Sequence, residues 1–151
     1  MKSLSKVLLA FALLVWGLSS VKAQSSPQDD KETKATEVKG LVNNKTFVFE
    51  AEKKGNQPLG YHVYSVAVSK DTLIAYLPGQ SGPLKFNSTN FGFNVIDTKD
   101  GGMDIIIKPG PATDVKQIKM NITSQGTASL YMTRRNAGPL SLDGYIKQED
   151  Y

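Results

Sequence analysis

Residues 91–110, FGFNVIDTKDGGMDIIIKPG, decide the fold of this chain. On both sides of the segment 98–102, apolar residues occupy every second position, which is typical of β-strands that bury one face. The Asp-Gly and Gly-Gly pairs within that segment supply the positive φ angles that tight hairpin turns need. The stretch therefore predicts a β-hairpin with one apolar face in the core. That face consists of Phe91, Phe93, Val95, Met103, Ile105 and Ile107.

The segments before and after this hairpin repeat the same period of two at short, regular intervals. We expect strands at 47–52, 61–69, 72–77, 84–86, 114–123, 127–133 and 140–146. Short connections favour antiparallel neighbours in chain order. The sequence therefore predicts an all-β fold with one N-terminal helix, in which a seven- or eight-stranded antiparallel meander forms a curved, barrel-like sheet or a β-sandwich. The hairpin would lie at the centre of this meander.

The predicted helix covers residues 31–44, where the hydrophobic period changes to three and four. Its apolar stripe consists of Ala35, Val38, Leu41 and Val42. An aspartate at position 29 or 30 can cap its start, and the two asparagines at 43–44 are a plausible end. Because an isolated helix of this length is marginal in water, we expect it to dock on the sheet and cover an opening.

Residues 1–23 have the pattern of a secretory signal peptide. A short basic start is followed by an apolar segment at 7–18, and small residues precede the cleavage site after Ala23. An apolar segment of 12 residues is too short to span the membrane, which takes about 20 residues in a helix. Residues 24–30 are polar and predicted to be a disordered leader, so a single β-rich domain is expected over 31–151.

Charge and composition exclude several classes of function. Cleavage of the signal removes three lysines and no acid, so the net charge falls from +4 to +1 and the argument for nucleic-acid binding disappears. The chain has no cysteine, so the mature domain depends on its core and not on disulfides. We expect a soluble periplasmic or secreted protein without a stable membrane anchor.

Catalytic and metal-binding motifs are absent from the sequence. His62 is the only histidine, and there is neither a cysteine nucleophile nor a G-x-S-x-G motif. Zinc sites draw chiefly on Cys and His, so no metal or other cofactor is expected. Glu50 and Glu52 share a strand face beside two lysines, which is interpreted as a solvated edge. We therefore do not expect an enzyme, although a hydrolase with two carboxylates is the least favoured alternative.

The acidic residues of the central hairpin have two interpretations. Asp97, Asp100 and Asp104 surround its turn and could hold calcium, but their spacing does not match an EF-hand loop. Asp100 followed by Gly101 is sufficiently explained as a turn. We expect no metal here.

The sequence leaves two kinds of binding function open. A surplus of apolar residues on both faces of some strands favours a small apolar or amphipathic ligand, with His62, Tyr64 and Tyr76 as the predicted ligand-binding residues. Alternatively, exposed apolar residues on the outer face form a patch for an envelope protein, which predicts an interaction or structural module. That patch would include Ile96, Ile106 and Tyr131.

Several segments together resemble a family of small secreted proteins, mostly from Bacteroidetes, described as domain of unknown function 4251. The resemblance runs from position 31 to about 147. It rests on the order and spacing of ATEVKGLVNNKTFVFEA, SKDTLIAYLP, PLKFNSTNFGFNV, KDGGMDIIIKP, ITSQGTASLYMT and PLSLDGYI. It implies export and a β-rich fold, and it implies no activity, cofactor or catalytic residue.

Overall fold

The computed structural model describes residues 27–61, 63–79 and 82–149. These residues form one helix, α1 (Pro27–Asn44), and ten strands, which confirms the predicted fold class. The strands are β1 (Phe47–Lys54), β2 (Gln57–Pro58), β3 (Ser65–Ser69), β4 (Thr72–Leu77), β5 (Leu84–Ser88), β6 (Gly92–Asp97), β7 (Met103–Lys108), β8 (Val115–Ile122), β9 (Thr127–Arg134) and β10 (Leu140–Gln148).

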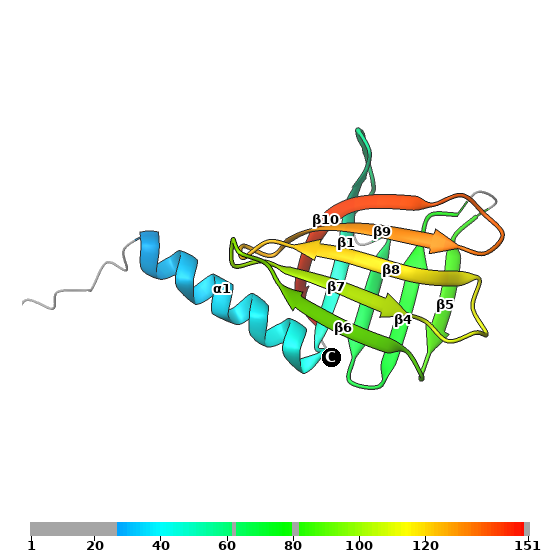
Figure 1. Ribbon diagram of the computed structural model, residues 1–151. Helices are drawn as coiled ribbons and strands as arrows, with labels where there is room; N and C mark the ends of the chain where they lie inside the picture. The colour runs from blue at the N-terminus through cyan, green and yellow to red at the C-terminus, as the bar shows by residue number, and fades with distance from the viewer. Residues whose placement is uncertain (1–26, 62, 80–81, 150–151) are drawn as a thin grey trace, which may run out of the picture.

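All strands belong to one strongly curled antiparallel sheet. Its order is β5-β4-β3-β1-β10-β9-β8-β7-β6, and the short β2 pairs with β1 beside this path. In Figure 1 the strands β7, β8 and β9 cross in front of β4 and β5 at a steep angle, as in a barrel. The sheet stays open because β5 and β6, which follow each other in the chain, form its two edges. The fold is a half-barrel and not a sandwich of two sheets.

The hairpin of β6 and β7 forms as predicted, but it lies at an edge of the sheet and not at its centre. The reason is the place of β1, which inserts between β3 and β10 and joins the first strands to the last. Met103, Ile105 and Ile107 on β7 are fully buried. The facing side chains of β6, Phe93 and Val95, are only partly buried because no further strand covers them.

The inner face of the curled sheet is filled by side chains. Alternate residues of nearly every strand point inward and pack in one cluster, as the period of two requires. The largest fully buried side chains are Phe47, Phe49, Leu73, Leu77, Met103, Ile105, Ile107, Ile118, Met120, Ile122, Leu130 and Met132. A half-barrel of this size is therefore stabilised by its own apolar side chains.

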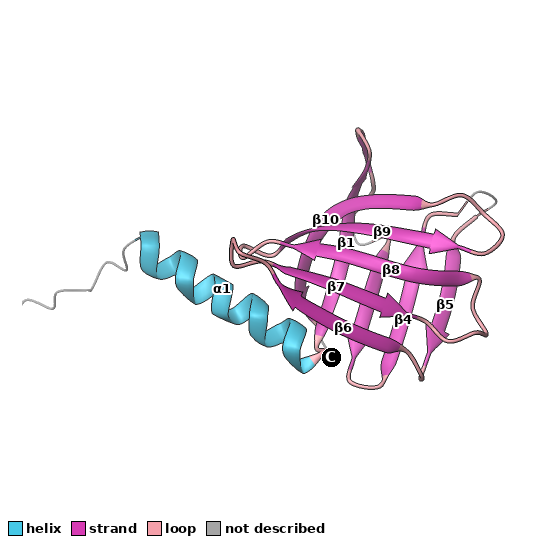
Figure 2. Ribbon diagram, in the orientation of Figure 1, coloured by secondary structure: helices cyan, strands magenta, loops and turns pink. Residues whose placement is uncertain are grey.

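The C-terminal half of α1 packs against one end of the half-barrel, while its N-terminal half stands clear of the sheet (Figure 2). Val38 and Val42 of the predicted stripe are buried. The helix ends at Asn44, where Lys45 takes a left-handed φ of 53°. The N–H of Thr46 donates to the carbonyl of Leu41 at 3.0 Å, which satisfies an otherwise unpaired helix carbonyl. The expected docking of the helix on the sheet is confirmed.

The prediction of a strand at 61–69 is wrong for the first half of that segment. The strand β3 begins only at Ser65, and the side chain of Tyr61 is 89% exposed. The physical reason is a bulge in β1 between Ala51 and Lys53, beyond which β1 pairs with β2 and leaves no edge for a longer β3. The chain instead returns through a loop, held where the N–H of Ala51 donates to the carbonyl of Tyr64 at 3.0 Å.

Candidate functional site

Glu50 is the one charged side chain that is buried among the described residues, with 7% of its surface exposed. It stands on the outer face of β1, between the inward-pointing Phe49 and the bulge that follows Ala51. The sequence-based interpretation of Glu50 as part of a solvated edge is therefore wrong. The local alternation was read correctly, but the loop that leads to β3 covers this part of the strand.

Two residues of β10 hold the carboxylate of Glu50. Tyr145 lies directly opposite Glu50 in the sheet, and its hydroxyl donates to Oε2 at 2.5 Å. The Nζ of Lys147 lies 2.7 Å from Oε1. Tyr145 and Lys147 are two positions apart on one strand, so both side chains project from the same face. Hydrogen bonds to an ionised group offset part of the cost of removing the carboxylate from water.

The same hydrogen bond changes the acidity of the tyrosine. The bond to Glu50 raises the pKa of Tyr145 to about 12, and partial burial and the negative charges of Glu50 and Glu52 act in the same direction. An ionised phenol beside a carboxylate would be repelled, so the neutral form is favoured. At neutral pH the hydroxyl of Tyr145 is therefore a fixed hydrogen-bond donor and not a base.

The backbone of β1 approaches β10 unusually closely at this point. A Cβ atom added to Gly144 would lie 1.8 Å from the carbonyl oxygen of Glu50 and 3.1 Å from Cα of Ala51. Only glycine permits such an approach between two strands. Gly144 thus lets β10 pass the bulge and brings Tyr145 into register with Glu50.

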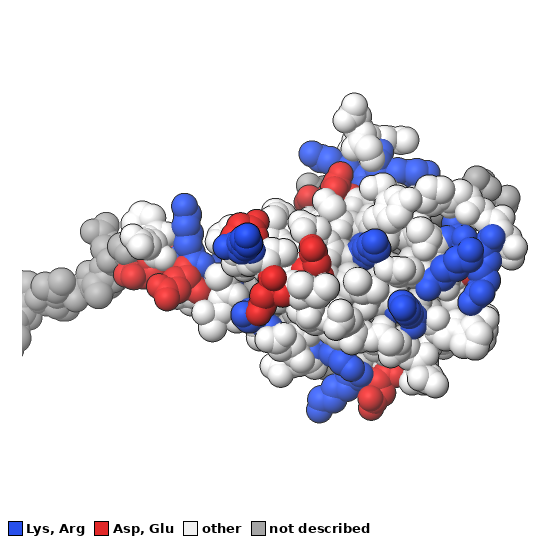
Figure 3. All heavy atoms as spheres, in the orientation of Figure 1, with Lys and Arg blue, Asp and Glu red and all other residues white. Residues whose placement is uncertain are grey.

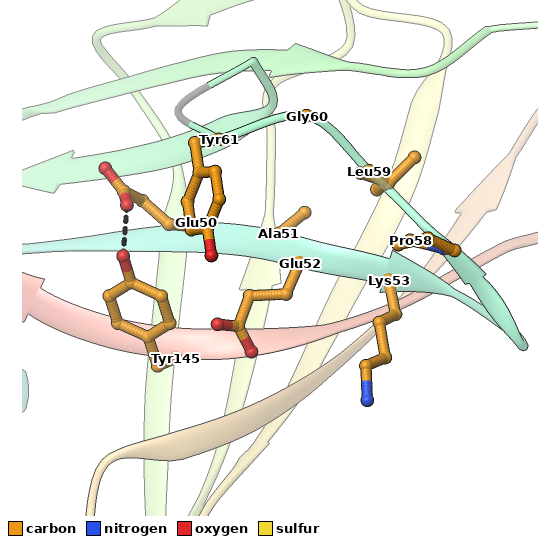
Figure 4. A pocket seen from close by; sticks show the side chains of 9 residues that line it. All are labelled: Glu50, Ala51, Glu52, Lys53, Pro58, Leu59, Gly60, Tyr61 and Tyr145. Carbon is orange, nitrogen blue, oxygen red and sulfur yellow. Dashed lines mark hydrogen bonds between the residues drawn. The ribbon is translucent and has the colours of Figure 1, made fainter.

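A hollow of about 340 Å³ opens above this acid. The loop after β2 forms one wall, and the strands β1 and β10 form the floor (Figure 4). Apolar groups and hydrogen-bonding groups therefore face the same space. The lining residues are Glu50, Ala51, Glu52, Lys53, Pro58, Leu59, Gly60, Tyr61 and Tyr145.

The residues predicted to bind a ligand lie elsewhere or outside the described residues. His62 lies outside the described part of the chain. Tyr64 and Tyr76 come together, with their rings stacked 5.7 Å apart at 25°. The Nζ of Lys85 lies 4.9 Å from the ring centre of Tyr76, which makes a cation–π contact. Neither tyrosine lines the hollow beside Glu50.

Each acidic residue of the β6–β7 hairpin contacts a different side chain. Asp97 forms an ion pair with Lys39 of α1 at 3.0 Å. Asp104 accepts a hydrogen bond from Nδ2 of Asn121 at 2.7 Å. Asp100 accepts one from the hydroxyl of Thr98, and this bond lowers the pKa of Asp100. Within the described residues, no group of three or more His, Cys, Asp or Glu side chains is placed to hold a metal ion.

The three apolar residues of the predicted surface patch share the outer face of the sheet. Ile106 on β7 lies beside Lys119 on β8, which lies beside Tyr131 on β9. Ile96 on β6 and Ile106 border a common hollow of about 250 Å³. On this side of the molecule, acidic side chains lie mainly on the half nearer α1, and a group of basic side chains lies at the opposite end (Figure 3).

Sequence reasoning missed the contact of Glu50 with Tyr145 and Lys147. Tyr145 and Lys147 are two positions apart in the last strand and must therefore share one face, which was only a weak sign that they bind a common partner. Their partner lies about one hundred residues earlier in the chain, and no local pattern connects the two segments.

Comparisons with known proteins identify the family. A search of curated proteins returns no match for the chain. The fold is similar to that of a DUF4251 family protein from Bacteroides eggerthii, known from a crystal structure. The TM-score is 0.59 at 14% identity, and the match covers 77% of this chain and 88% of that chain. Residues 29–146 match the family described as Domain of unknown function (DUF4251). The chain therefore belongs to this family, in agreement with the resemblance of its segments.

Proposed function

We propose that the chain is an exported, non-enzymatic binding module of the cell envelope, and that the hollow above Glu50 takes a small amphipathic molecule. The inner face of the sheet is already filled, so the site belongs on the outside. Among the described residues, no helix is long and apolar enough to cross a membrane. The signal pattern at 1–23 lies outside the described residues and supports export as a sequence-based argument.

The observation that carries this proposal is the mixed lining of the hollow. Leu59 and Pro58 offer an apolar wall, and the exposed ring of Tyr61 borders it. The opposite side presents the carboxylate of Glu52 and the hydroxyl of Tyr145 (Figure 4). Pockets for small molecules combine an apolar surface with a few placed polar groups in this way. A purely apolar ligand would displace water from the Glu52 carboxylate without replacing its hydrogen bonds, so the amphipathic class is favoured.

The contacts of the Glu50 carboxylate favour a binding module over a hydrolase. A glycosidase of the two-carboxylate type needs one acid that delivers a proton. The ammonium group of Lys147 at 2.7 Å favours the ionised carboxylate, and the hydroxyl of Tyr145 occupies its second oxygen. Glu50 thus serves as a fixed tie between β1 and β10 at the floor of the hollow.

Native mass spectrometry of protein purified from its own host tests this proposal. We expect the wild type to retain a small molecule of a size that suits a hollow of about 340 Å³. Tyr61→Ala should lose this adduct, while Tyr131→Ala, which removes an exposed tyrosine from another part of the outer face, should keep it. Fluorescence titration with 1-anilinonaphthalene-8-sulfonate gives a second readout on the same three proteins. No adduct and no probe binding, or equal loss in both variants, would refute the assignment.

A second candidate function is a protein-interaction module. The observation in its favour is that Ile96, Ile106 and Tyr131 gather on one outer face, as an interaction patch requires. In-cell crosslinking from a photoreactive residue at position 106, compared with one at position 85, separates the two functions. A partner protein captured only from position 106 would favour the interaction module.

A further inference from the structure

We propose that the free edge of β6 pairs with β6 of a second copy of this chain, in an antiparallel arrangement about a twofold axis that passes through Asn94. The inference is independent of the hollow above Glu50, because β1 and β10 lie several strands away in the sheet. It concerns how copies of the half-barrel associate and not what they bind.

The two edges of the half-barrel differ in their protection. Proteins commonly guard an exposed edge with lysine, proline, a bulge or a short strand. The strand β5 follows Pro83 and carries Lys85 as its second residue. The strand β6, GFNVID, has neither lysine nor proline, and its register with β7 runs without a bulge. Among the described residues, no strand pairs with the other side of β6.

Apolar side chains beside this edge remain incompletely covered. Phe93 and Val95 point to the inner face and are only partly buried, in contrast to Ile105 and Ile107 on the neighbouring strand. Ile96 points to the outer face and is 50% exposed. A strand placed against β6 would cover side chains on both faces and would pair the free backbone groups at the same time. A lipid would bury those backbone groups without pairing them, so a polypeptide strand is the better occupant.

Pairing about Asn94 aligns residues 92–96 of the two copies and keeps the inner and outer faces of the sheet matched. With Asn94 opposite Asn94 of the second copy, Phe93 faces Val95 and Gly92 faces Ile96. Opposed residues of antiparallel strands project to the same side, so inner residues then meet inner residues. A slip by one residue would place inner residues of one copy against outer residues of the other. The twofold axis generates each contact twice, as in other interfaces between identical subunits.

The charges near the edge fit this register. Asp97 of the second copy lies opposite Phe91, and the Nζ of Lys45 lies 5.7 Å from the ring centre of Phe91 and 5.3 Å from that of Phe93. Lys45 is the described non-glycine residue with a positive φ, in the turn that ends α1. Each copy thus presents a cation beside the position where the other copy presents an acid. Asp97 already forms an ion pair with Lys39 of its own helix at 3.0 Å, so Lys45 of the second copy would add to a charge that is already partly balanced.

Sedimentation equilibrium of the mature protein over about 5 to 500 µM tests the proposal, since a contact of one six-residue strand belongs to the small interfaces. We expect a concentration-dependent dimer. Asn94→Lys and Asn94→Asp each place like charges at the axis and should weaken the dimer at least about fivefold. An equimolar mixture of the two variants should restore it, because opposite charges then meet.

The matched control is Asn87→Lys, which adds the same charge to an exposed asparagine on the other edge strand, β5. It should dimerise like the wild type. Circular dichroism checks that all variants are folded. We expect them to fold, because the substituted positions are exposed. A wild type that stays monomeric over the whole range overturns the proposal. A dimer that Asn94→Lys leaves unchanged, or that Asn87→Lys weakens equally, also overturns it.

Discussion

Gly144→Ala is the most informative single change, because it tests the close approach that builds the Glu50 site. The added Cβ would lie 1.8 Å from the carbonyl oxygen of Glu50 and 2.8 Å from its carbonyl carbon. Both atoms belong to the backbone, so no side-chain rotation relieves the overlap. The strand β1 must move away from β10 by more than about 1 Å in an interior that is closely packed.

The magnitude follows from two contributions. Overpacking of a well-packed region costs about 1–3 kcal/mol. The displacement also weakens the hydrogen bond of Tyr145 to the buried carboxylate, a charge-assisted bond that contributes about 1.5–3 kcal/mol. We therefore expect the free energy of unfolding to fall by about 3–5 kcal/mol, a large share of the roughly 5–15 kcal/mol of a small domain.

Urea unfolding followed by circular dichroism measures this change, with Gly138→Ala as the control. No atom outside the chain neighbours lies within 4 Å of the Cβ position at Gly138, so that variant should differ from the parent by less than about 0.5 kcal/mol. A Gly144→Ala protein whose unfolding free energy stays within about 1 kcal/mol of the parent would contradict the reasoning. It would show that β1 and β10 tolerate a wider separation than the structure has.

Three further changes have defined outcomes. The free energy of unfolding should fall as the pH rises from about 10 to 12, because the unfolded chain loses the Tyr145 proton that the folded chain retains. Urea titrations at both pH values should show that Tyr145→Phe lacks this part of the fall, which is about 1 kcal/mol after solvent screening. Gly40→Ala should stabilise α1 by about 1 kcal/mol in thermal melts, because an added Cβ meets nothing there, and an unchanged melt would indicate that this helical turn is frayed. Ile105→Asp, at a fully buried position, should cost several kcal/mol and unfold the domain, while a melt like the parent's would mean that the face is misassigned.

Local patterns were sufficient to predict the helix and most of the strands of this protein. The period of two around residues 98–102 predicted β6, β7 and the turn between them. The apolar stripe of α1 was predicted with Val38 and Val42 on its buried face. Such patterns are readable because the alternation of side chains along a strand or helix depends only on neighbouring residues.

The arrangement of these elements was predicted less well. The hairpin of β6 and β7 was expected at the centre of a meander, and the structure has it at the edge. Phe93 and Val95 are for this reason only partly covered, although their alternation is the same as that of Ile105 and Ile107. An identical local pattern thus leads to different burial, because burial depends on which strand lies next to it.

What the sequence by itself determined is the fold class, the helix and most of the strands, together with the family to which these segments belong. Only the tertiary structure decided that β1 pairs with β10 and joins the first strands to the last, and that Glu50 is thereby buried against Tyr145 and Lys147. The physical reason is the range of the interactions. A backbone period is set by adjacent residues, whereas strand pairing, a bulge and the burial of one carboxylate arise between segments about one hundred residues apart.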